Sequence, residues 1–588
     1  MAKEKPAPVA KSPAARTTAS IFVNGFLDAD EAPVVLEPAE KPAEFPEIPP
    51  DTNLPVKLLY QFQDFVNDNL TFVKGVQCLV VLYLGQILYL FLARTDNNDA
   101  MYTTAFNILG CLLAMGLAYR AQKRKHDEQP DTYAAPVLPG FNILYSIFVP
   151  MLLVLLMADL KGAAFQANLA LNNFAARSLH PIAKVLSSFV FYYMYNEAQT
   201  LELVQFVKVL WIYFSIEYAI STWNESCTTD YAGNVVVATS MSDPEIHFVA
   251  VACVNVLVYL ELLPLTENTI PLYIVRCLVL SLVIACAVSY PLYELYKYLG
   301  SSALASAVSV VVVGVSCGSF YYATNYQFNV FVAKKEVFLW LFDHITEYDA
   351  RTKILVSWIV CFLTAIPAMY FLSINNVLSL NMRRKAWHFL LLATLTYPLV
   401  QDPQFTALAV LGSSVVFVVT EFLRCTEITF VGGWLKEQLR LFQDEKDLEG
   451  PLNLSYIFLL IGTSIPIAYG LAVDDPVSIR SFLGLAALGL GDSAASIVGK
   501  KFGKIKWKGG DKKFEGTVAH IVATFAYFVF VDSYVLPEGH RVQNWENLFI
   551  VAVIGGVVEG STSLNDNVLV PAITLIAHEA LNRVFPGH

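Results

Sequence analysis

The residues that could do chemistry gather in the last third of the chain. Asp492 stands among small residues, in the run Gly491-Asp492-Ser493-Ala494-Ala495-Ser496, inside a long apolar stretch. An ionisable side chain within a membrane-spanning stretch is costly and usually functional, and small neighbours allow a backbone or a ligand to approach. The alternative use for Asp492 is an interhelical hydrogen bond. Two more acids, Glu559 and Asp566, stand at the ends of a polar connection between two apolar runs.

A lysine-rich loop comes after Asp492. Residues 500–513 contain seven lysines, a tryptophan (Trp507) and the pair Gly509-Gly510. Lysines and the backbone N–H groups of a glycine turn can hold a polyphosphate, while carboxylates hold its metal ion. The alternative is a loop that only touches anionic head groups, which would explain the lysines but not the other residues. Trp507 would either stack on a base or anchor at the membrane interface.

One histidine also stands at the edge of an apolar run. His388 comes just after the basic stretch Arg383-Arg384-Lys385. A histidine at the membrane interface is a candidate proton acceptor, and a purely structural histidine is the alternative. The stretch 442–447 adds acidic residues, for which a solvated loop is the default interpretation.

Composition determines the kind of element that positions these residues. The chain has 588 residues, of which 56% are hydrophobic and 15% are charged, against about a quarter charged in soluble proteins. Within lipid only helices or closed barrels satisfy the backbone, and the long continuous apolar runs favour helices. We therefore predict an all-α polytopic integral membrane protein with roughly fifteen transmembrane helices. Candidate spans include 303–322, 327–342, 480–499 and 547–558.

The pattern of apolar runs divides the chain into three regions. Residues 1–55, rich in Pro, Ala and Glu, read as a disordered cytoplasmic tail. Residues 56–375 form an N-terminal multispanning region, and residues 376–588 form a C-terminal one that carries the acids, the lysine-rich loop and His388. The nine cysteines are scattered without a C-x-x-C pair, which indicates neither a disulfide framework nor a structural zinc site.

Basic loops predict the orientation. Loops rich in Lys and Arg, at 120–125, 383–385 and 500–513, should be cytoplasmic. Counting spans between them places all the motif loops on this same face. Asn224, in the acceptor sequence Asn224-Glu225-Ser226, would then lie on the opposite, lumenal face, where it could be glycosylated.

In order and spacing, the motifs resemble the CTP-dependent polyprenol kinases, specifically the dolichol kinases. The resemblance runs from about Arg383 to the C-terminus. It rests on R-K-x-x-H at Arg384 to His388, the stretch Phe442 to Leu460, D-x-A-A-x-x-x-G at Asp492 to Gly499, Trp507, K-x-x-E-G at Lys512 to Gly516, and the closing acids Glu559 and Asp566-Asn567.

Two departures from the family pattern stand in the lysine-rich loop. Asp511 takes the first position of a lysine pair, with the second lysine displaced to Lys513, and Lys508 replaces a proline. These changes leave the roles of single lysines open but not that of the loop. The region before residue 376 resembles the family only in being multispanning.

The resemblance implies transfer of the γ-phosphate of CTP to the terminal hydroxyl of dolichol, a polyprenol lipid, giving dolichyl phosphate and CDP. It implies a multi-pass protein of the endoplasmic reticulum membrane, with its site facing the cytosol, which supplies the lipid carrier for protein glycosylation. Asp492, Glu559 and Asp566 would hold Mg²⁺ or another divalent cation, and one of them would accept the alcohol proton. His388 is a second candidate for that base.

The same resemblance implies a nucleotide site in and around the loop. Lys512 and Lys513 would hold the CTP phosphates, and Trp507 would lie against the base. The whole set expected at this site comprises Gly499, Trp507, Gly509, Gly510, Lys512, Lys513, Glu515, Gly516 and Asn567.

Two rival functions are compatible with parts of this pattern. A CTP-dependent lipid cytidylyltransferase would transfer CMP instead of phosphate. A transporter would use Asp492 and Glu559 on an ion path, but transporters typically show paired broken helices in two halves, and this sequence shows none. We expect no nucleic-acid partner, and the oligomeric state stays open, a homo-oligomer included.

Overall fold

The structure is a computed structural model, and it describes the greater part of the chain. The described ranges are 71–94, 202–229, 235–241, 243–258, 263–300, 303–443, 450–510, 512–542, 544–562 and 565–586, with isolated residues elsewhere. The predicted tail falls almost wholly outside them, as do most of the predicted spans between residues 100 and 196. The chain divides into two compact units, Met1–Val66 and Asn67–His588, and the second unit contains all the helices and strands named below.

The first part of this unit is helical apart from one β-hairpin. Its elements are α2 (Phe72–Arg94), α7 (Leu203–Asn224), β1 (Glu225–Thr229), β2 (Val235–Thr239), α8 (Asp243–Val258), α9 (Ile270–Leu299), α10 (Ala303–Phe331), α11 (Val337–Thr346) and α12 (Asp349–Ile374).

The second part carries the motifs, and its named elements in the described residues are all helices. They are α13 (Leu380–Leu395), α14 (Pro398–Gln401), α15 (Pro403–Thr426), α16 (Phe430–Leu439), α17 (Ser455–Ala472), α18 (Ser493–Phe502), α19 (Phe514–Phe530), α20 (Trp545–Ser561) and α21 (Asp566–Val584). A π-helical segment, Leu485–Asp492, directly precedes α18. A second one, Val531–Val535, directly follows α19. Short 3-10 turns lie at 440–442, 479–482 and 538–540.

The protein is a multi-pass membrane protein. Within the described residues, nine helical stretches are long and apolar enough to cross a bilayer. Four further helices, α8, α13, α20 and α21, are 16 to 19 residues long. The helical membrane fold predicted from composition is confirmed, while the total of about fifteen spans stays a prediction.

The predicted span 327–342 is wrong. Helix α10 continues to Phe331, and a separate short helix, α11, begins at Val337. Glu336 caps α11 by accepting the backbone N–H of Leu339 at 2.8 Å. The apolar residues on both sides concealed this break, because hydropathy averages over a turn that contains only a few polar residues.

Successive helices end alternately at two faces of the membrane protein. We call the site face the one at which α13, α19 and α21 begin and α18 and α20 end, and we call the other the far face. At the far face, Asn268 donates to Asp474 and accepts from Gln404, both at 2.5 Å. The motif loops all meet at the site face, as the count of spans predicted.

The predicted position of Asn224, on the face opposite the motif loops, is wrong. Asn224 is 1% exposed, and its carboxamide exchanges two hydrogen bonds with the backbone of Met241, at 2.9 and 2.7 Å. The neighbouring Ser240 hydroxyl accepts the N–H of Leu452 at 2.7 Å, just before α17 begins. Asn224 therefore lies at the site face with the motif loops, and its amide is not available to carry a glycan.

The β-hairpin after Asn224 is an exception to the predicted all-helical fold. Strands β1 and β2 pair antiparallel, with Glu225 opposite Thr239 and Thr229 opposite Val235. Their runs of threonine and valine have high strand propensity. This short hairpin leaves the helical membrane architecture unchanged.

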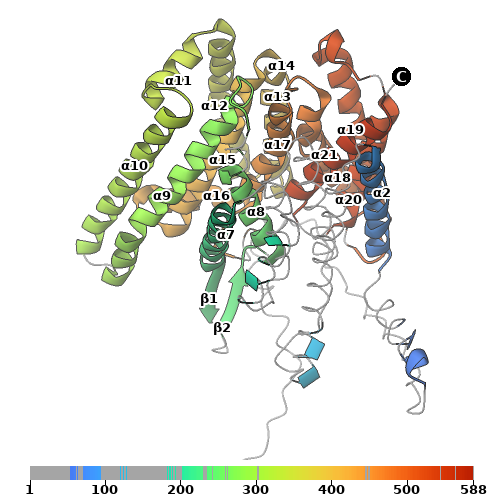
Figure 1. The fold of residues 1–588 in the computed structure, drawn as a ribbon, viewed down its shortest axis with the longest axis horizontal. Helices are drawn as coiled ribbons and strands as arrows, with labels where there is room; N and C mark the ends of the chain where they lie inside the picture. The colour runs from blue at the N-terminus through green and yellow to red at the C-terminus, as the bar shows by residue number, and fades with distance from the viewer. Residues whose placement is uncertain are drawn as a thin grey trace, which may run out of the picture. The chain divides into compact units, whose positions relative to one another are not determined.

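The helices around the motifs pack into one core. Helix α19 packs on α20, α20 on α21, and α21 on α17, while α2 lies against α20 and α21 (Figure 1). Tyr469, Phe482 and Phe528 are among the largest fully buried side chains of this core. Close packing of this kind leaves little room for side chains to shift, so the ends of these helices are held in fixed positions.

Candidate active site

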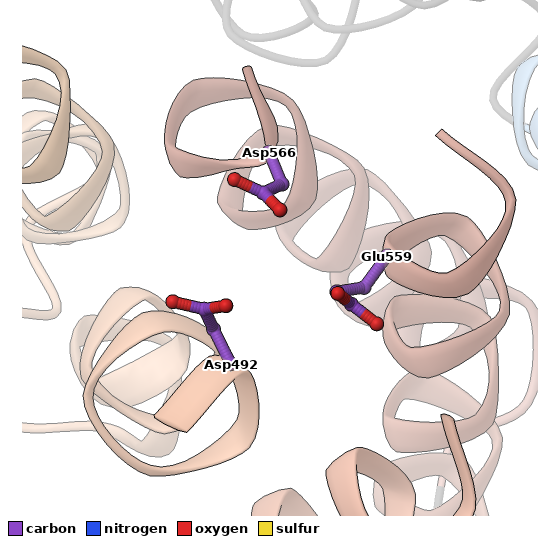
Figure 2. Close-up of side chains that lie close together, drawn as sticks. All are labelled: Asp492, Glu559 and Asp566. Atoms are coloured by element: carbon purple, nitrogen blue, oxygen red, sulfur yellow. The ribbon is translucent and has the colours of Figure 1, made fainter. Parts of the chain in front are cut away.

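Three carboxylates meet at the site face. Asp492 ends the first π-helical segment, Glu559 lies in the last turn of α20, and Asp566 is the first residue of α21. One oxygen from each lies within 4.8 Å of the others, and Figure 2 shows the three carboxylates turned toward a common centre. Asp492 and Glu559 are each 6% exposed. We call these three residues the acidic trio; the sequence predicted their grouping.

Two lysines pair with different members of the acidic trio and compensate its charge. The Lys512 ammonium donates to Glu559 Oε1 at 2.7 Å, to Asp566 Oδ2 at 2.8 Å and to the Glu559 carbonyl at 2.8 Å. Lys385, from α13, forms an ion pair with Asp492. The sequence alone predicts Lys385 only as part of a basic loop, although its spacing of three from His388 places both on one helix face.

The charge of Lys512 is secured by its partners. Burial alone would lower the pKa of its ammonium, but the Asp566 and Glu559 carboxylates outweigh that effect and raise the pKa above its ordinary 10.5. Lys512 therefore stays positively charged over the neutral pH range. It is a fixed cation at the edge of the trio.

His388 supports the segment that carries Asp492. Its Nδ1 lies 2.7 Å from the Leu488 carbonyl, which can only accept, so Nδ1 carries the proton. The same nitrogen is 3.4 Å from Asp492 Oδ2. π-Helical turns leave some carbonyls without a strong internal hydrogen bond and often mark functional sites. We therefore infer that the bond from His388 to the Leu488 carbonyl stabilises this segment. The predicted role of His388 as a base stays a prediction, and it would have to use Nε2.

His520, which sequence reasoning did not single out, lies beside the same segment. It belongs to α19 and is fully buried. A Cβ atom at Gly491 would come within 2.7 Å of His520 Nε2 and 2.4 Å of Thr524 Oγ1. Only glycine fits at position 491, directly before the catalytic candidate Asp492. An ionisable residue within an apolar span was the one signal that could have indicated His520.

The lysine-rich loop folds as a hairpin. Lys506 and Lys513 pair as an antiparallel bridge, and the N–H of Trp507 donates to the Lys512 carbonyl at 3.1 Å. The N–H of Gly510 donates back to the Trp507 carbonyl at 3.0 Å, with Gly509 at a φ of +89°, as position three of a type II turn requires. We call residues 503–513 the basic hairpin; it is the element that delivers Lys512.

Trp507 and Glu515 hold the basic hairpin in place. Trp507 is 8% exposed, and its indole N–H donates to Thr517 Oγ1 at 3.0 Å. Glu515 accepts the backbone N–H groups of Lys504 and Ile505 at 2.8 and 3.1 Å. The predicted contacts of Trp507 with a base, and of Glu515 and Gly510 with CTP, stay predictions. The contacts seen in the structure are with the protein itself.

The remaining predicted residues also make structural contacts. A Cβ atom at Gly516 would lie 2.8 Å from the Ala495 carbonyl and 3.4 Å from the Cα of Gly499, so the two glycines let α18 and α19 cross closely. The Lys513 side chain lies over Gly503. Asn567 donates to the Ser455 carbonyl at 3.2 Å and thereby ties α21 to α17.

A buried ionic network secures the stretch that precedes α17. Glu421 of α15 accepts from Arg424 at 2.6 Å, from the N–H of Asn453 at 2.5 Å and from the Tyr456 hydroxyl at 2.5 Å. Sequence reasoning noted residues 451–456 only as part of the resemblance. Their role is to connect α15 to the start of α17, which Asn567 contacts.

The acidic trio fits a hard divalent cation. Carboxylate oxygens are the ligands that Mg²⁺ prefers, and three of them converge from three separate helical segments. The Lys512 ammonium bonds two of the three carboxylates, so the trio already has one cation as a partner.

Comparison with known proteins identifies relatives for this chain. Residues 37–229 match the family model of the dolichol kinase N-terminal domain. The dolichol kinase of Saccharomyces cerevisiae is 35% identical over 243 residues, which cover 41% of this chain and 45% of that protein. Over these residues the chain is similar to a dolichol kinase. The match before residue 230 shows that the N-terminal region resembles the family in more than being multispanning.

Other dolichol kinases agree with this relationship. Dolichol kinase sec59 of Schizosaccharomyces pombe is 32% identical over 258 residues, covering 42% of this chain and 50% of that protein. The human dolichol kinase is 29% identical over 259 residues, covering 41% and 47%. The chain therefore spans about half the length of the curated relatives it matches. No solved structure matches it.

Proposed function

We propose that this protein is a dolichol kinase, which transfers the γ-phosphate of CTP to the terminal hydroxyl of dolichol and releases dolichyl phosphate and CDP. The observation that carries the proposal is the acidic trio with Lys512 bound to it at the membrane edge. The relatives from yeasts and human are dolichol kinases, which supports the choice of lipid substrate.

The depth of the trio suits a reaction between a lipid and a water-soluble nucleotide. Glu559 lies in the last turn of α20 and Asp566 begins α21, and we place both at the level where the bilayer meets water. A prenyl chain would stay among the helices while its hydroxyl reaches the trio. CTP would approach from the aqueous side, where the basic hairpin lies.

The proposed reaction needs positioning more than covalent chemistry. The dolichol oxygen forms a bond to the γ-phosphorus, and the bond from that phosphorus to the oxygen bridging the β- and γ-phosphates breaks, leaving CDP. The hydroxyl proton passes to a carboxylate of the trio. Because the transition state of phosphoryl transfer is loose, charge neutralisation and alignment supply most of the catalysis.

The asymmetry of the site suggests how the work is divided. Lys512 lies on the side of Glu559 and Asp566, and we assign it to the phosphates of CTP. Asp492 lies on the other side, held by Lys385 and near His388, and we assign it to the hydroxyl and its proton. A divalent cation, when bound by the trio, would neutralise phosphate charge.

The cellular setting belongs to the same proposal. The basic loops favour a cytosolic site face, where CTP is available, in the membrane of the endoplasmic reticulum. The product would supply the lipid carrier on which glycans are assembled for protein glycosylation.

The deciding experiment traces the label of CTP. Purified full-length protein in phospholipid nanodiscs is given dolichol, Mg²⁺ and CTP labelled either at the γ-phosphate or at the α-phosphate. We expect γ-label in the lipid and α-label in CDP. If the α-label enters the lipid and the γ-label leaves in pyrophosphate, the protein is a cytidylyltransferase and the proposal is wrong.

The residue test is Asp492→Asn. We expect transfer to fall by more than about 100-fold, since even outer partners of a metal site cost 10- to 100-fold when removed. Glu437→Gln, an exposed carboxylate in α16 on the same face, is the matched control and should keep full activity. Near-normal turnover of Asp492→Asn in folded protein would remove Asp492 from the mechanism.

A further inference from the structure

Most lysines of the basic hairpin and of the adjoining end of α18 do not take part in the site. Five of them are exposed, and none forms an ion pair with another described residue. They are Lys500, Lys501, Lys504, Lys506 and Lys508. Among the described lysines of this surface, only Lys512 bonds the acidic trio. The surface therefore carries a dense positive charge, and the proposed reaction assigns no role to these five lysines.

Apolar side chains are interleaved with these lysines. Phe502 is 60% exposed, Ile505 is 61% exposed, and Phe514, at the start of α19, is 47% exposed. The ammonium of Lys501 lies 5.5 Å from the centre of the Phe502 ring. A surface that binds only a soluble nucleotide has no need of three exposed apolar groups. A surface that rests on head groups and dips into the acyl boundary uses both kinds of side chain.

The fold fixes the depth of this surface. Membrane helix α18 ends at Phe502, and membrane helix α19 begins at Phe514. The basic hairpin connects these two span ends, so it lies at the level of the lipid head groups. Charge complementarity at that level favours anionic phospholipids.

We propose that the basic hairpin, with the last turn of α18, is a binding surface for anionic phospholipid head groups of the leaflet on the site face. The class of ligand is a phosphodiester lipid with net negative charge, such as phosphatidylinositol or phosphatidylserine. The surface comprises Lys500, Lys501, Lys504, Lys506 and Lys508 with the apolar contacts Phe502, Ile505 and Phe514.

The contact would also steady the site, because the hairpin is tied to it at three points. Glu515 holds the N–H groups of Lys504 and Ile505. Trp507 bonds Thr517 and packs where any side chain at Gly560, next to Glu559, would collide with it. Lys512 completes the connection to the trio. Lipid bound outside the hairpin would thus hold Lys512 in position inside it.

The test measures lipid binding without any turnover. Full-length protein in detergent is incubated with equal amounts of phosphatidylinositol and phosphatidylcholine, and the lipids retained after gel filtration are counted. The variant Lys504→Gln/Lys506→Gln removes two charges from the hairpin that form no ion pair with another described residue. The matched control, Lys297→Gln/Lys436→Gln, removes two lysines from the same face that pair with Glu294 and Glu427.

We expect the wild type and the control to retain phosphatidylinositol in preference to phosphatidylcholine. The hairpin variant should lose about three- to tenfold of that preference, and added salt should weaken binding in all three. An unchanged preference in the hairpin variant would overturn the proposal. If the KM for CTP also rises in that variant, the lysines serve the nucleotide instead of the lipid.

Activity provides the second arm. In nanodiscs of phosphatidylcholine alone, wild-type transfer should be several-fold slower than in nanodiscs with anionic lipid, and the hairpin variant should respond less. The binding arm needs neither CTP nor dolichol. If the kinase assay fails, the lipid proposal is therefore unaffected. If the wild-type protein shows no preference for anionic lipid, the kinase proposal is unaffected.

Discussion

At the scale of single residues, the two carboxylates that bond Lys512 are also candidate ligands of a metal ion. The Lys512 ammonium bonds Glu559 and Asp566, so it both prepares the phosphate site and competes with a cation for the carboxylates. In Lys512→Met we expect transfer to fall by more than about 100-fold, as when one preorganised donor is removed. Mn²⁺ binding without nucleotide, measured by electron paramagnetic resonance, should tighten by about tenfold for each 1.4 kcal/mol of repulsion removed.

The opposite signs of these two effects make the test of Lys512 specific. A variant that simply unfolds loses both activity and Mn²⁺ binding. Lys334→Met, an exposed lysine at the far face, should change neither. Unaltered Mn²⁺ affinity in folded Lys512→Met would show that the ammonium does not compete for the trio.

The sequence predicted the residues that meet at the site better than their individual roles. Asp492, Glu559, Asp566 and Lys512 could be grouped because ionisable groups at span ends have few other uses. The structural work of Trp507 could not be predicted, since an indole looks the same in sequence whether it stacks on a base or packs against a helix. Hydrogen bonds to Thr517 are visible only in the fold.

At the scale of elements, the π-helical segment Leu485–Asp492 determines where Asp492 points. Two histidines lie against it, His388 from α13 and His520 from α19. In Gly491→Ala the new methyl group would meet Thr524 and His520 at less than 3 Å. We expect about 1–3 kcal/mol of destabilisation from overpacking, seen as a lower melting temperature, and a loss of transfer because Asp492 is displaced.

The control for Gly491→Ala is a glycine in open space. A Cβ atom at Gly412, within α15, would meet nothing within 4 Å, so Gly412→Ala should be neutral or stabilise by up to about 1 kcal/mol through helix propensity. Equal melting temperatures and equal activities for the two variants would contradict the close packing around Gly491.

Elements were predicted where they match the hydropathy pattern and missed where they do not. Apolar runs indicated the helices that carry Asp492 and Glu559 correctly, since burial in an apolar environment demands such runs. The π-helical turns were not foreseen, because no simple residue pattern distinguishes them from α-helix. The break before α11 was missed because its polar turn is short.

At the scale of the whole molecule, the alternation of helices places every motif loop on one face. Counting spans predicted this for the last third of the chain, where each span is distinct. It failed for Asn224, because the count between Asn224 and the motif loops included the span 327–342, which the structure does not contain. One span too many inverts the predicted face of everything before it. Asn224 bonds Met241, and Ser240 bonds Leu452. These contacts place that segment at the site face.

This arrangement can be tested in cells with glycan acceptors. A Gly/Ser-rich insertion of about twenty residues, long enough as a flexible chain to clear the membrane surface, carries one Asn-Gly-Thr acceptor. Inserted after Leu265, at the far face, it should be glycosylated. Inserted after Val377, between α12 and α13 at the site face, it should not, and native Asn224 should stay unmodified. The measurement is a mobility shift that endoglycosidase removes.

Each outcome of the glycan test bears on the proposed chemistry. Both acceptor positions are exposed, so burial does not explain a negative result at either. Modification after Val377 and not after Leu265 would show that the site face is lumenal. The acidic trio would then lie away from cytosolic CTP. Modification after Leu265 alone leaves Lys512, the trio and the basic hairpin facing the compartment that holds the nucleotide, as the proposed reaction requires.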